Sequence, residues 1–386
     1  MKLSDKISGV QASATLAITS RAKAMISEGD DVVILAAGEP DFDTPEVVKT
    51  AGIEAINRGQ TKYTPASGNL SLKKAICRKL LSDNGLEYDP KNIVVSCGAK
   101  HSIYNVLQVI CSENDEVLII PPYWLSYPEM IKLAGAKPVV LPMREGYKTT
   151  AEDIREAITP RTKAVIINSP SNPTGVIYGE DELKEIAKVC LDKDILIISD
   201  EIYEKILYDG KKHVSIAGIS KEVRDATIVI NGVSKSHSMT GWRIGYAAGN
   251  ENIMKMVSTL QSHSTSGPCS ISQAASECAL TEDLEDEMKK NCEMFQKRRD
   301  FLLDGFAGEE KMKAFKPSGA FYMYCDISGS GMDSMEFSKR LLAEEKVAVI
   351  PCAPFGDDNA IRISFAANMK TLEEGVKRIK KWLSRG

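Results

Sequence analysis

Three apolar runs near the middle of the sequence end in polar residues of types that perform chemistry. TKAVIIN leads into SPSNPTG, ILIIS into DEIY, and TIVINGV into Ser234 and Lys235. A lysine amine forms imines with aldehydes, and it becomes nucleophilic near neutral pH when burial and nearby cations lower its pKa. Taken alone, a lysine is most often a solvated surface residue. Its position at the end of an apolar run makes Lys235 a candidate for covalent chemistry with a carbonyl group.

The elements around these residues predict an α/β fold. Short apolar runs alternate with helical patterns from NIVVSCG through EVLIIPP and KPVVLP to RIGYAAG. Strands that alternate with helices imply a buried, mainly parallel sheet. Ligands of open α/β sheets bind beyond the carboxyl ends of the strands. The polar residues that follow the runs are therefore predicted to surround one site.

The pattern changes near residue 270, where a long charged helical stretch begins. Fewer strands follow it, in GAFYMYCDI, VAVIPC and AIRISFA. A chain of 386 residues exceeds what one hydrophobic core usually supports. We expect a three-layer α/β/α large domain with a mostly parallel sheet over residues 46–270. A smaller α+β domain is expected from residues 271–386 together with an N-terminal segment, residues 1–45.

A helix is predicted over EVVKTAGIEAINR, near the start of the large domain. Thr44 and Pro45 have the residue types of an N-cap and of a first helical residue. Gly59 suits the left-handed residue that follows many helix C-termini. The loop TKYTPASG should follow this helix.

Composition and charge exclude several classes of function. The formal net charge is -4, with 43% hydrophobic and 26% charged residues, so no basic face for a nucleic acid is expected. No apolar run has the length of a membrane span, and the N-terminus lacks the apolar segment of a signal peptide. We therefore expect no membrane contact and a cytoplasmic location.

The nine cysteines include no CxxC pair, which favours reduced thiols. The four histidines lack ligand spacing, so no metal is expected.

The strings NPTG, SDEIY and SKSHSMTGWRIGY are specific when taken together. GEPDFDTP, KYTPASG, GAKHSIYN, PPYWLSYPE, SGAFY and AIRISFA accompany them along nearly the whole chain. On these motifs the chain resembles the aspartate aminotransferase family of fold type I pyridoxal-phosphate enzymes. The resemblance implies the cofactor pyridoxal 5′-phosphate and ping-pong transfer of an amino group between an L-amino acid and a 2-oxo acid. It also implies a homodimer with shared active sites.

The resemblance assigns roles around the cofactor ring. Lys235 carries the cofactor covalently and then moves the proton between the substrate Cα and cofactor C4′. Asp200 pairs with the pyridine nitrogen. Asn172 and Tyr203 hydrogen-bond the phenolic oxygen and Trp124 lies against the ring, with Asn172 and Trp124 also bordering the substrate. Each residue has an ordinary structural interpretation too, as a turn asparagine, a helix cap or a core aromatic side chain.

The cofactor phosphate needs donors at one end of the site. Gly98, Ala99 and Lys100 open a predicted helix, whose free backbone amides and dipole favour an anion. By resemblance, Arg243 clamps the phosphate, and Tyr63 reaches it from the second subunit. For these residues a surface salt bridge and a loop aromatic are the ordinary alternatives.

Gly232 departs from the family pattern. Many relatives have a serine three residues before the lysine, where it bonds the phosphate, so one donor is expected to be missing here. We do not expect Ser234 to replace it, because adjacent positions of an extended segment point to opposite sides.

By resemblance, Arg362 in AIRISFA matches the arginine that holds the substrate α-carboxylate, a role that suits its planar bidentate fork. An ordinary surface arginine is the alternative, but its apolar strand neighbours place it on the opposite face from theirs. Gly38 should help through its backbone amide. The acidic-substrate branch of the family places a lysine at the Lys100 position against the distal carboxylate of aspartate or glutamate, aided by the hydroxyls matching Ser13 and Thr15. A neutral pocket that suits alanine or an aromatic donor stays open as an alternative.

Two rival functions are compatible with the same fold. A β-lyase acting on cysteine-like substrates shares the lysine, aspartate and asparagine, and it would release pyruvate and sulfide instead of turning over a keto acid. A non-enzymatic regulator that senses cofactor or amino acid is disfavoured, because no helix-turn-helix segment is attached.

Overall fold

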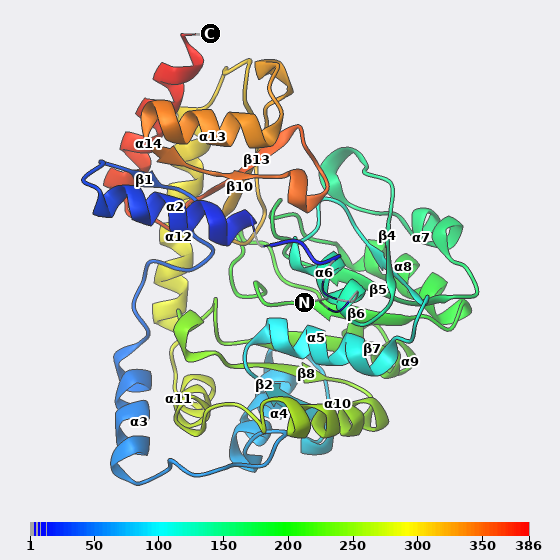
Figure 1. Ribbon diagram of the computed structural model, residues 1–386. Coiled ribbons are helices and arrows are strands. Elements are labelled where there is room, and N and C mark those ends of the chain that lie inside the picture. Colours follow the sequence, from blue (N-terminus) through cyan, green and yellow to red (C-terminus); the bar gives the residue numbers. More distant parts are fainter. Residues whose placement is uncertain (1–3, 5–6, 8, 13, 386) are drawn as a thin grey trace.

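The fold is built on two sheets with helices packed around them (Figure 1). The computed structural model describes residues 4, 7, 9–12 and 14–385. The larger sheet has seven strands in the order β2-β8-β7-β6-β5-β3-β4. In chain order these are β2 (Ile93–Ser96), β3 (Glu116–Ile119), β4 (Lys137–Val140), β5 (Thr162–Asn168), β6 (Leu196–Asp200), β7 (Thr227–Gly232) and β8 (Gly245–Ala248). Only β8 runs antiparallel to its neighbours, which confirms a mainly parallel sheet.

Both faces of the seven-stranded sheet are covered by helices. Along the strands, alternate apolar side chains point to opposite faces, so Val117 and Ile166 enter one core cluster while Leu118 and Val165 enter another. One face packs on α5 (Ala99–Ile110), α6 (Ser126–Leu133) and α10 (Glu251–Ser264). The other packs on α3 (Glu46–Asn57), α4 (Leu70–Asn84), α7 (Ala151–Ala157), α8 (Glu180–Asp192), α9 (Lys221–Asp225) and α11 (Ser270–Thr281). The three-layer α/β/α prediction is therefore confirmed.

The second sheet is smaller and antiparallel. Its order is β12-β13-β10-β9, from β9 (Lys313–Phe315), β10 (Tyr322–Asp326), β12 (Ile350–Pro351) and β13 (Ala360–Ser364). Beside it, β1 (Val33–Ile34) pairs in parallel with β11 (Val347–Ala348). The helices of this part are α2 (Ala14–Ser27), α12 (Glu285–Gly305), α13 (Ser334–Glu345) and α14 (Met369–Leu383).

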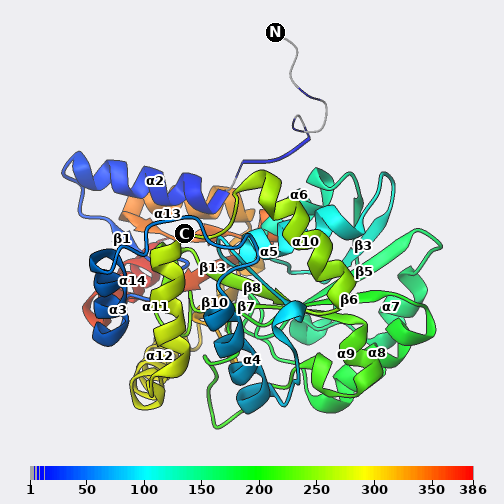
Figure 2. The ribbon, with the colours of Figure 1, turned by 90° about the horizontal axis from the view of Figure 1, so that it is seen from below.

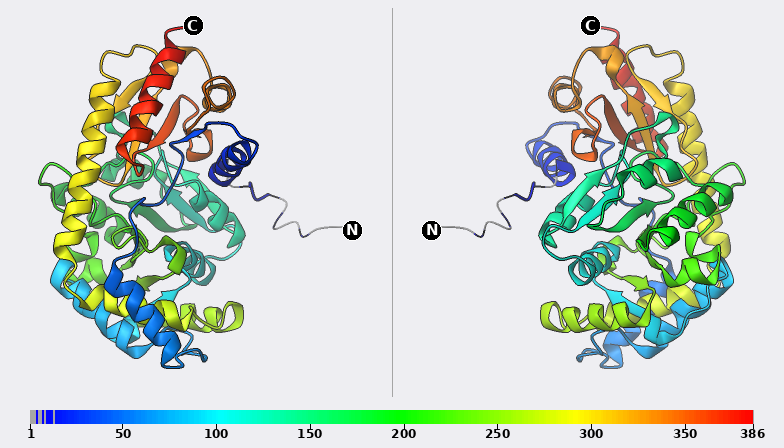
Figure 3. Two further views of the ribbon diagram at one scale, coloured as in Figure 1. Left: turned by 90° about the vertical axis from the view of Figure 1, so that its left-hand side faces the viewer. Right: turned by 90° about the vertical axis from the view of Figure 1, so that its right-hand side faces the viewer.

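Two helices show how the parts are joined. Helix α12 runs along the side of the molecule past both sheets (Figure 3). Helix α2 lies beside α13 (Figure 2), where Met25 and Leu342 share an apolar cluster. Residues from the N-terminal end of the chain thereby pack with residues from its C-terminal third. Short 3-10 helices complete the structure: η1 (Pro90–Asn92), η2 (Glu145–Tyr147), η3 (Ile216–Gly218), η4 (Thr240–Trp242), η5 (Ser328–Ser330) and η6 (Ala353–Phe355).

The predicted helix near residue 46 forms, but its cap is not the one we expected. Helix α3 begins at Glu46 without a side-chain cap. The Thr44 hydroxyl instead donates to the Ser238 carbonyl at 2.8 Å and accepts from Trp242 Nε1 at 3.0 Å. Gly59 has the predicted left-handed conformation, with φ of 71°. Among the described residues, no helix combines the length and the apolarity that crossing a membrane requires.

Candidate active site

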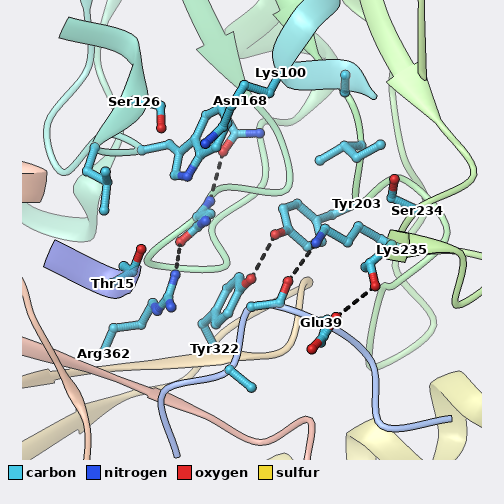
Figure 4. A pocket seen from close by; sticks show the side chains of 18 of the residues that line it. Thr15, Glu39, Lys100, Ser126, Asn168, Tyr203, Ser234, Lys235, Tyr322 and Arg362 are labelled. Atoms are coloured by element: carbon cyan, nitrogen blue, oxygen red, sulfur yellow. Dashed lines mark hydrogen bonds between the residues drawn. The ribbon is translucent and has the colours of Figure 1, made fainter. Parts of the chain in front are cut away.

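A cavity of about 640 Å³ lies where the parallel strands end, between the two sheets. Figure 4 shows Lys235 and Arg362 entering it from opposite sides. Most of the predicted site residues line it: Gly38, Ala99, Lys100, Trp124, Asn172, Asp200, Tyr203, Lys235, Arg243 and Arg362. The cavity is thus at the place that the rule for open α/β sheets predicts.

Lys235 lies in the turn that follows β7, with its amine inside the cavity. Its Nζ donates to the Gly38 carbonyl at 2.6 Å. Burial lowers the pKa of Lys235 from its ordinary value of 10.5 to about 8, against a raising influence from Glu39 and with further lowering by Arg362 and Arg243. A large fraction of the amine is therefore unprotonated at mildly alkaline pH, as a nucleophile requires.

Asp200 ends β6 and is almost completely buried. Its Oδ2 accepts from the Tyr127 hydroxyl at 2.6 Å, and its Oδ1 accepts from the Ile202 amide at 3.3 Å. Burial raises the pKa of Asp200 to about 6, although both hydrogen bonds act to lower it. A buried carboxylate without a paired cation is costly, so a protonated ring nitrogen beside Asp200 would stabilise it.

Arg362 on β13 is only 3% exposed. Its Nη1 donates to Asn172 Oδ1 at 2.8 Å and its Nη2 to the Ala36 carbonyl at 3.3 Å, while Nε has no partner among the described residues. Tyr322 lies under the guanidinium, with its ring centroid 4.1 Å from Cζ, and its hydroxyl lies 2.9 Å from that of Tyr203. Arg362 is therefore oriented and keeps a donor free, as a carboxylate-binding arginine requires.

The opposite end of the cavity is suited to an anion. Helix α5 starts after Gly98, so the amides of Ala99 and Lys100 have no carbonyl partner within the helix. Arg243 lies against this terminus and donates to the Thr240 carbonyl at 2.9 Å and the Cys97 carbonyl at 3.3 Å. A side chain on Gly98 would clash with Arg243, because its Cβ would lie 2.3 Å from Nη2. Glycine at this position therefore allows the arginine to reach the helix terminus.

The missing serine at Gly232 has a steric explanation. A Cβ there would lie 2.8 Å from Gly245 Cα and 2.9 Å from the Ile244 carbonyl, so the neighbouring strand leaves no room for a side chain. The reason we gave against Ser234 was wrong, because residues 234–237 form a turn and not an extended segment. Ser234 lines the cavity together with Lys235.

The cavity contains a further cation beside Trp124. Lys100 Nζ lies 4.7 Å from the Trp124 ring centroid, and burial and Arg243 lower its pKa. Thr15 and Thr19, one turn apart on α2, also line the cavity. Ser13, the other predicted hydroxyl, lies outside the described residues.

Two predicted residues do not line the cavity. Gly98 lies behind Arg243, as described above. Tyr63 is 96% exposed, in the loop between α3 and α4. A contact between Tyr63 and this cavity would therefore have to come from a second subunit.

A family model described as aminotransferase class I and II matches residues 30–379. The chain belongs to this family. This aminotransferase is 48% identical to an aspartate aminotransferase of Bacillus subtilis (strain 168), with all of both chains covered. It is 50% identical to that of Bacillus sp. (strain YM-2) over 99% of each chain. Its structure matches an aspartate aminotransferase from Thermus thermophilus with maleate, with a TM-score of 0.95 and 39% identity over 99% of each chain.

The cavity of this aminotransferase fits pyridoxal phosphate, on which the family generally depends. The cofactor has an aldehyde, a basic ring nitrogen, a flat ring and a phosphate. Lys235 offers an amine, Asp200 a buried carboxylate, and Trp124 an aromatic face. Arg243 and the free amides of α5 offer an anion site that a side chain on Gly98 would fill.

Sequence reasoning missed three polar residues of the site in this aminotransferase. Tyr127 donates to Asp200, Tyr322 contacts both Tyr203 and Arg362, and Glu39 lines the cavity beside Gly38. Tyr127, Tyr322 and Glu39 lie within the strings PPYWLSYPE, SGAFY and GEPDFDTP, so the motifs pointed to all three without indicating a role.

A buried polar cluster behind Asp200 was also missed. Glu201 Oε2 lies 3.0 Å from His213 Nε2, and Glu204 accepts from Lys79, and from Asn231 at 2.8 Å. The two carboxylates and the imidazole are close enough together to hold a metal ion. The Lys79 ammonium pairs with Glu204, so this cluster has its own cation. Through Glu204, the cluster links Lys79 and Asn84 of α4 to the ends of β6 and β7, which precede or contain Asp200 and Lys235.

Proposed function

We propose that this aminotransferase moves the amino group between L-aspartate and a 2-oxo acid such as 2-oxoglutarate. One observation carries the proposal: a single cavity contains Lys235, the buried Asp200, the oriented Arg362 and the additional cation Lys100. The two Bacillus relatives are both named aspartate aminotransferases, which supports the donor. The Thermus thermophilus structure contains maleate, a dicarboxylate, which supports a second carboxylate in the substrate.

Pyridoxal phosphate is the proposed cofactor. Lys235 would hold it covalently, Asp200 would pair with the ring nitrogen, and Asn172 with Tyr203 would bond its phenolic oxygen. Trp124 would cover the ring. Arg243 and the first-turn amides of α5, from Ala99 and Lys100, would hold its phosphate. When bound, the cofactor withdraws electrons from the substrate and thereby stabilises negative charge at Cα.

The residues of the chain bind and move protons in a defined order. Arg362 binds the α-carboxylate through its guanidinium, assisted by the backbone at Gly38. Lys235 Nζ, freed when the amino acid enters, takes the proton from Cα and returns it at cofactor C4′. The amino acid and the 2-oxo acid use the same cavity in turn, so the kinetics are ping-pong.

The second carboxylate of the substrate selects among amino acids. It needs a cation or several donors, because the cavity removes its water. Lys100 supplies the charge, and Thr15 on α2 supplies a hydroxyl. Phenylalanine and alanine lack this carboxylate and should be poorer donors.

We also propose a homodimer in the cytoplasm. Tyr63 would reach the phosphate site of the other subunit. Exposed apolar side chains on α3 and α4, which flank its loop, support a covered surface: Ile53, Ile56 and Leu70.

The expected division into residues 46–270 and residues 1–45 with 271–386 is likewise a proposal, and we propose it with the second boundary moved past α11. Helix α11 packs on α3 and α4, so by its contacts it lies with the large sheet. We propose that the chain passes from the large part to the small part within α12.

A donor panel tests the proposal. Aspartate, phenylalanine and alanine would be assayed with 2-oxoglutarate, and cysteine would be assayed for pyruvate and sulfide release. We expect aspartate to give the highest kcat/KM. A preference for phenylalanine or alanine would contradict the acidic substrate, and pyruvate with sulfide as the main products would contradict the aminotransferase assignment.

A further inference from the structure

The cavity contains one carboxylate without an assigned role. Five cations line it: Lys23, Lys100, Lys235, Arg243 and Arg362. Among the described lining residues, only Asp200 and Glu39 are acidic. Asp200 is buried against Tyr127 and faces the ring position in the proposed function. Glu39 is therefore the acidic group left for the substrate.

Glu39 is exposed and is hydrogen-bonded beside the lysine. Its Oε2 accepts from the Thr240 hydroxyl at 2.8 Å. Its neighbour Gly38 accepts from Lys235 Nζ through the backbone carbonyl, at 2.6 Å. Figure 4 shows Glu39 and Lys235 on the same side of the cavity, with one of these two contacts at each side chain. Among the described residues, the Glu39 side chain hydrogen-bonds Thr240 and makes no ion pair.

The charge of Glu39 acts on Lys235. After burial, Glu39 is the strongest influence on the pKa of Lys235, and it raises that pKa while Arg362 and Arg243 lower it. Its carboxylate is therefore within electrostatic range of the atom with which an amino donor must react.

An amino acid enters this cavity as a zwitterion. Arg362 attracts its carboxylate, but its ammonium group must approach Lys235 through a cavity whose other charged side chains are mostly cations. Like charges repel strongly where water is displaced. An anion beside Lys235 would remove this repulsion for the amino form of the substrate, while a 2-oxo acid has no ammonium group to bind.

We propose that Glu39, oriented by Thr240, binds the α-ammonium group of the amino donor and so distinguishes the amino form of a substrate from its oxo form. The inference rests on the proposed function, because it takes Arg362 as the α-carboxylate site. It assigns Glu39 a direct contact with the substrate and makes Thr240 a positioning residue.

Equilibrium binding to the holoenzyme tests the assignment. Two ligands would be titrated by calorimetry into holoenzyme whose bond between Lys235 and the cofactor has been reduced with borohydride, so that an amino ligand cannot displace Lys235 and keeps its ammonium group. The ligands are 2-methylaspartate, which has the ammonium group, and maleate, which has two carboxylates and no amino group. In Glu39→Gln the Kd of 2-methylaspartate should rise about tenfold, as expected for loss of a charge-assisted contact. The Kd of maleate should stay the same or fall, because a negative charge has been removed.

Two further variants complete the design. Thr240→Val leaves the Glu39 charge in place but releases its orientation, so it should weaken 2-methylaspartate by a smaller factor, again without weakening maleate. Asp43→Asn removes an exposed carboxylate from the same segment, outside the cavity, and should change neither Kd. Unchanged binding of 2-methylaspartate to Glu39→Gln, or an equal loss for both ligands, would overturn the assignment. If Glu39→Gln fails to fold, Thr240→Val decides by the same comparison.

The wild-type enzyme separates this inference from the proposed function. If it neither binds maleate nor accepts aspartate, the proposed function fails. If it does both and the variants do not discriminate between the ligands, only the role of Glu39 is wrong.

Discussion

Arg362 Nη1 donates to Asn172 Oδ1 over 2.8 Å, although 190 positions separate the two residues. Arg362 belongs to β13 of the small sheet, and Asn172 to the segment after β5 of the large sheet. The hydrogen bond therefore joins the two parts of the molecule at the cavity. It fixes the proposed carboxylate-binding group relative to the proposed cofactor site, so substrate and cofactor meet in one orientation.

Replacing Asn172 with alanine should release Arg362 from this orientation. A hydrogen bond to a charged group contributes about 1.5 to 3 kcal/mol, so kcat/KM for aspartate should fall roughly ten- to a hundredfold. Maleate binding should weaken as well, since it depends on the arginine. Asn359→Ala, an exposed change next to β13, is the control. Unchanged maleate affinity in Asn172→Ala would show that Arg362 does not need this contact.

Three of the predicted residues that line the cavity share one property. Asp200, Asn172 and Lys235 follow parallel strands, and the ends of such strands meet at one edge of a sheet whatever the details of packing. The position of each residue at the end of an apolar run was therefore enough to predict that the three lie close together.

The residues that sequence reasoning missed depend on distant partners. Tyr203 and Tyr322 are 119 positions apart, and Glu39 and Thr240 are 201 positions apart. The Thr44 cap was wrong for the same reason, because its hydroxyl pairs with Ser238 across 194 positions. Local residue types predict caps and turns, but a distant partner that appears only on folding can compete for the same polar atom.

The pKa of Lys235 predicts how the chain without cofactor should react with pyridoxal phosphate. Only the unprotonated amine attacks an aldehyde, so the rate should rise with pH and level off above about pH 8. Lys235→Ala should show no covalent attachment at any pH and no transamination. Attachment would be followed by absorbance after mixing. A rate that keeps rising towards the ordinary lysine value of 10.5 would contradict the lowered pKa.

Lys100→Ala tests the acidic-substrate proposal directly. Loss of a charge-assisted contact of about 1.5 to 3 kcal/mol should reduce kcat/KM for aspartate roughly ten- to a hundredfold. Phenylalanine has no second carboxylate, so its kcat/KM should change much less. The ratio of the two values in wild type and variant is the measurement. An equal fall for both donors would assign Lys100 to the cofactor phosphate and not to substrate selection.

Mixed dimers test whether Tyr63 acts across subunits. Tyr63→Ala should weaken cofactor binding, and Lys235→Ala should be inactive. A dimer with one chain of each kind has one site with the native Lys235 and the native Tyr63 of the partner subunit. Random exchange makes about half of the dimers mixed, so roughly a quarter of all sites should be native. Activity at limiting cofactor that does not exceed the sum of the separate variants would contradict a shared site.

The Glu204–Lys79 pair should make the stability of the enzyme sensitive to acid. Burial alone would raise the pKa of Glu204, but the Lys79 ammonium and other donors lower it to about 2, compared with 4.5 for an ordinary glutamate. Glu204 therefore binds its proton more weakly in the folded chain than in the unfolded one. Its contribution to stability is complete above pH 4.5 and is lost as the pH falls towards 2.

Glu204→Gln should remove this contribution and leave the buried Lys79 with only the more distant Asp83 carboxylate, 3.6 Å from its Nζ, as a counter-charge. Breaking one side of a buried pair typically destabilises a protein by about 3 to 5 kcal/mol. We expect the urea midpoint at pH 7 to fall clearly, and the loss relative to wild type to shrink as the pH is lowered below 4.5. Glu180→Gln, which breaks the exposed pair with Lys184 on α8, is the matched control and should leave the midpoint unchanged. Equal midpoints for Glu204→Gln and wild type at pH 7 would mean that the neighbouring donors, and not the charge of Glu204, hold α4 against the strand ends.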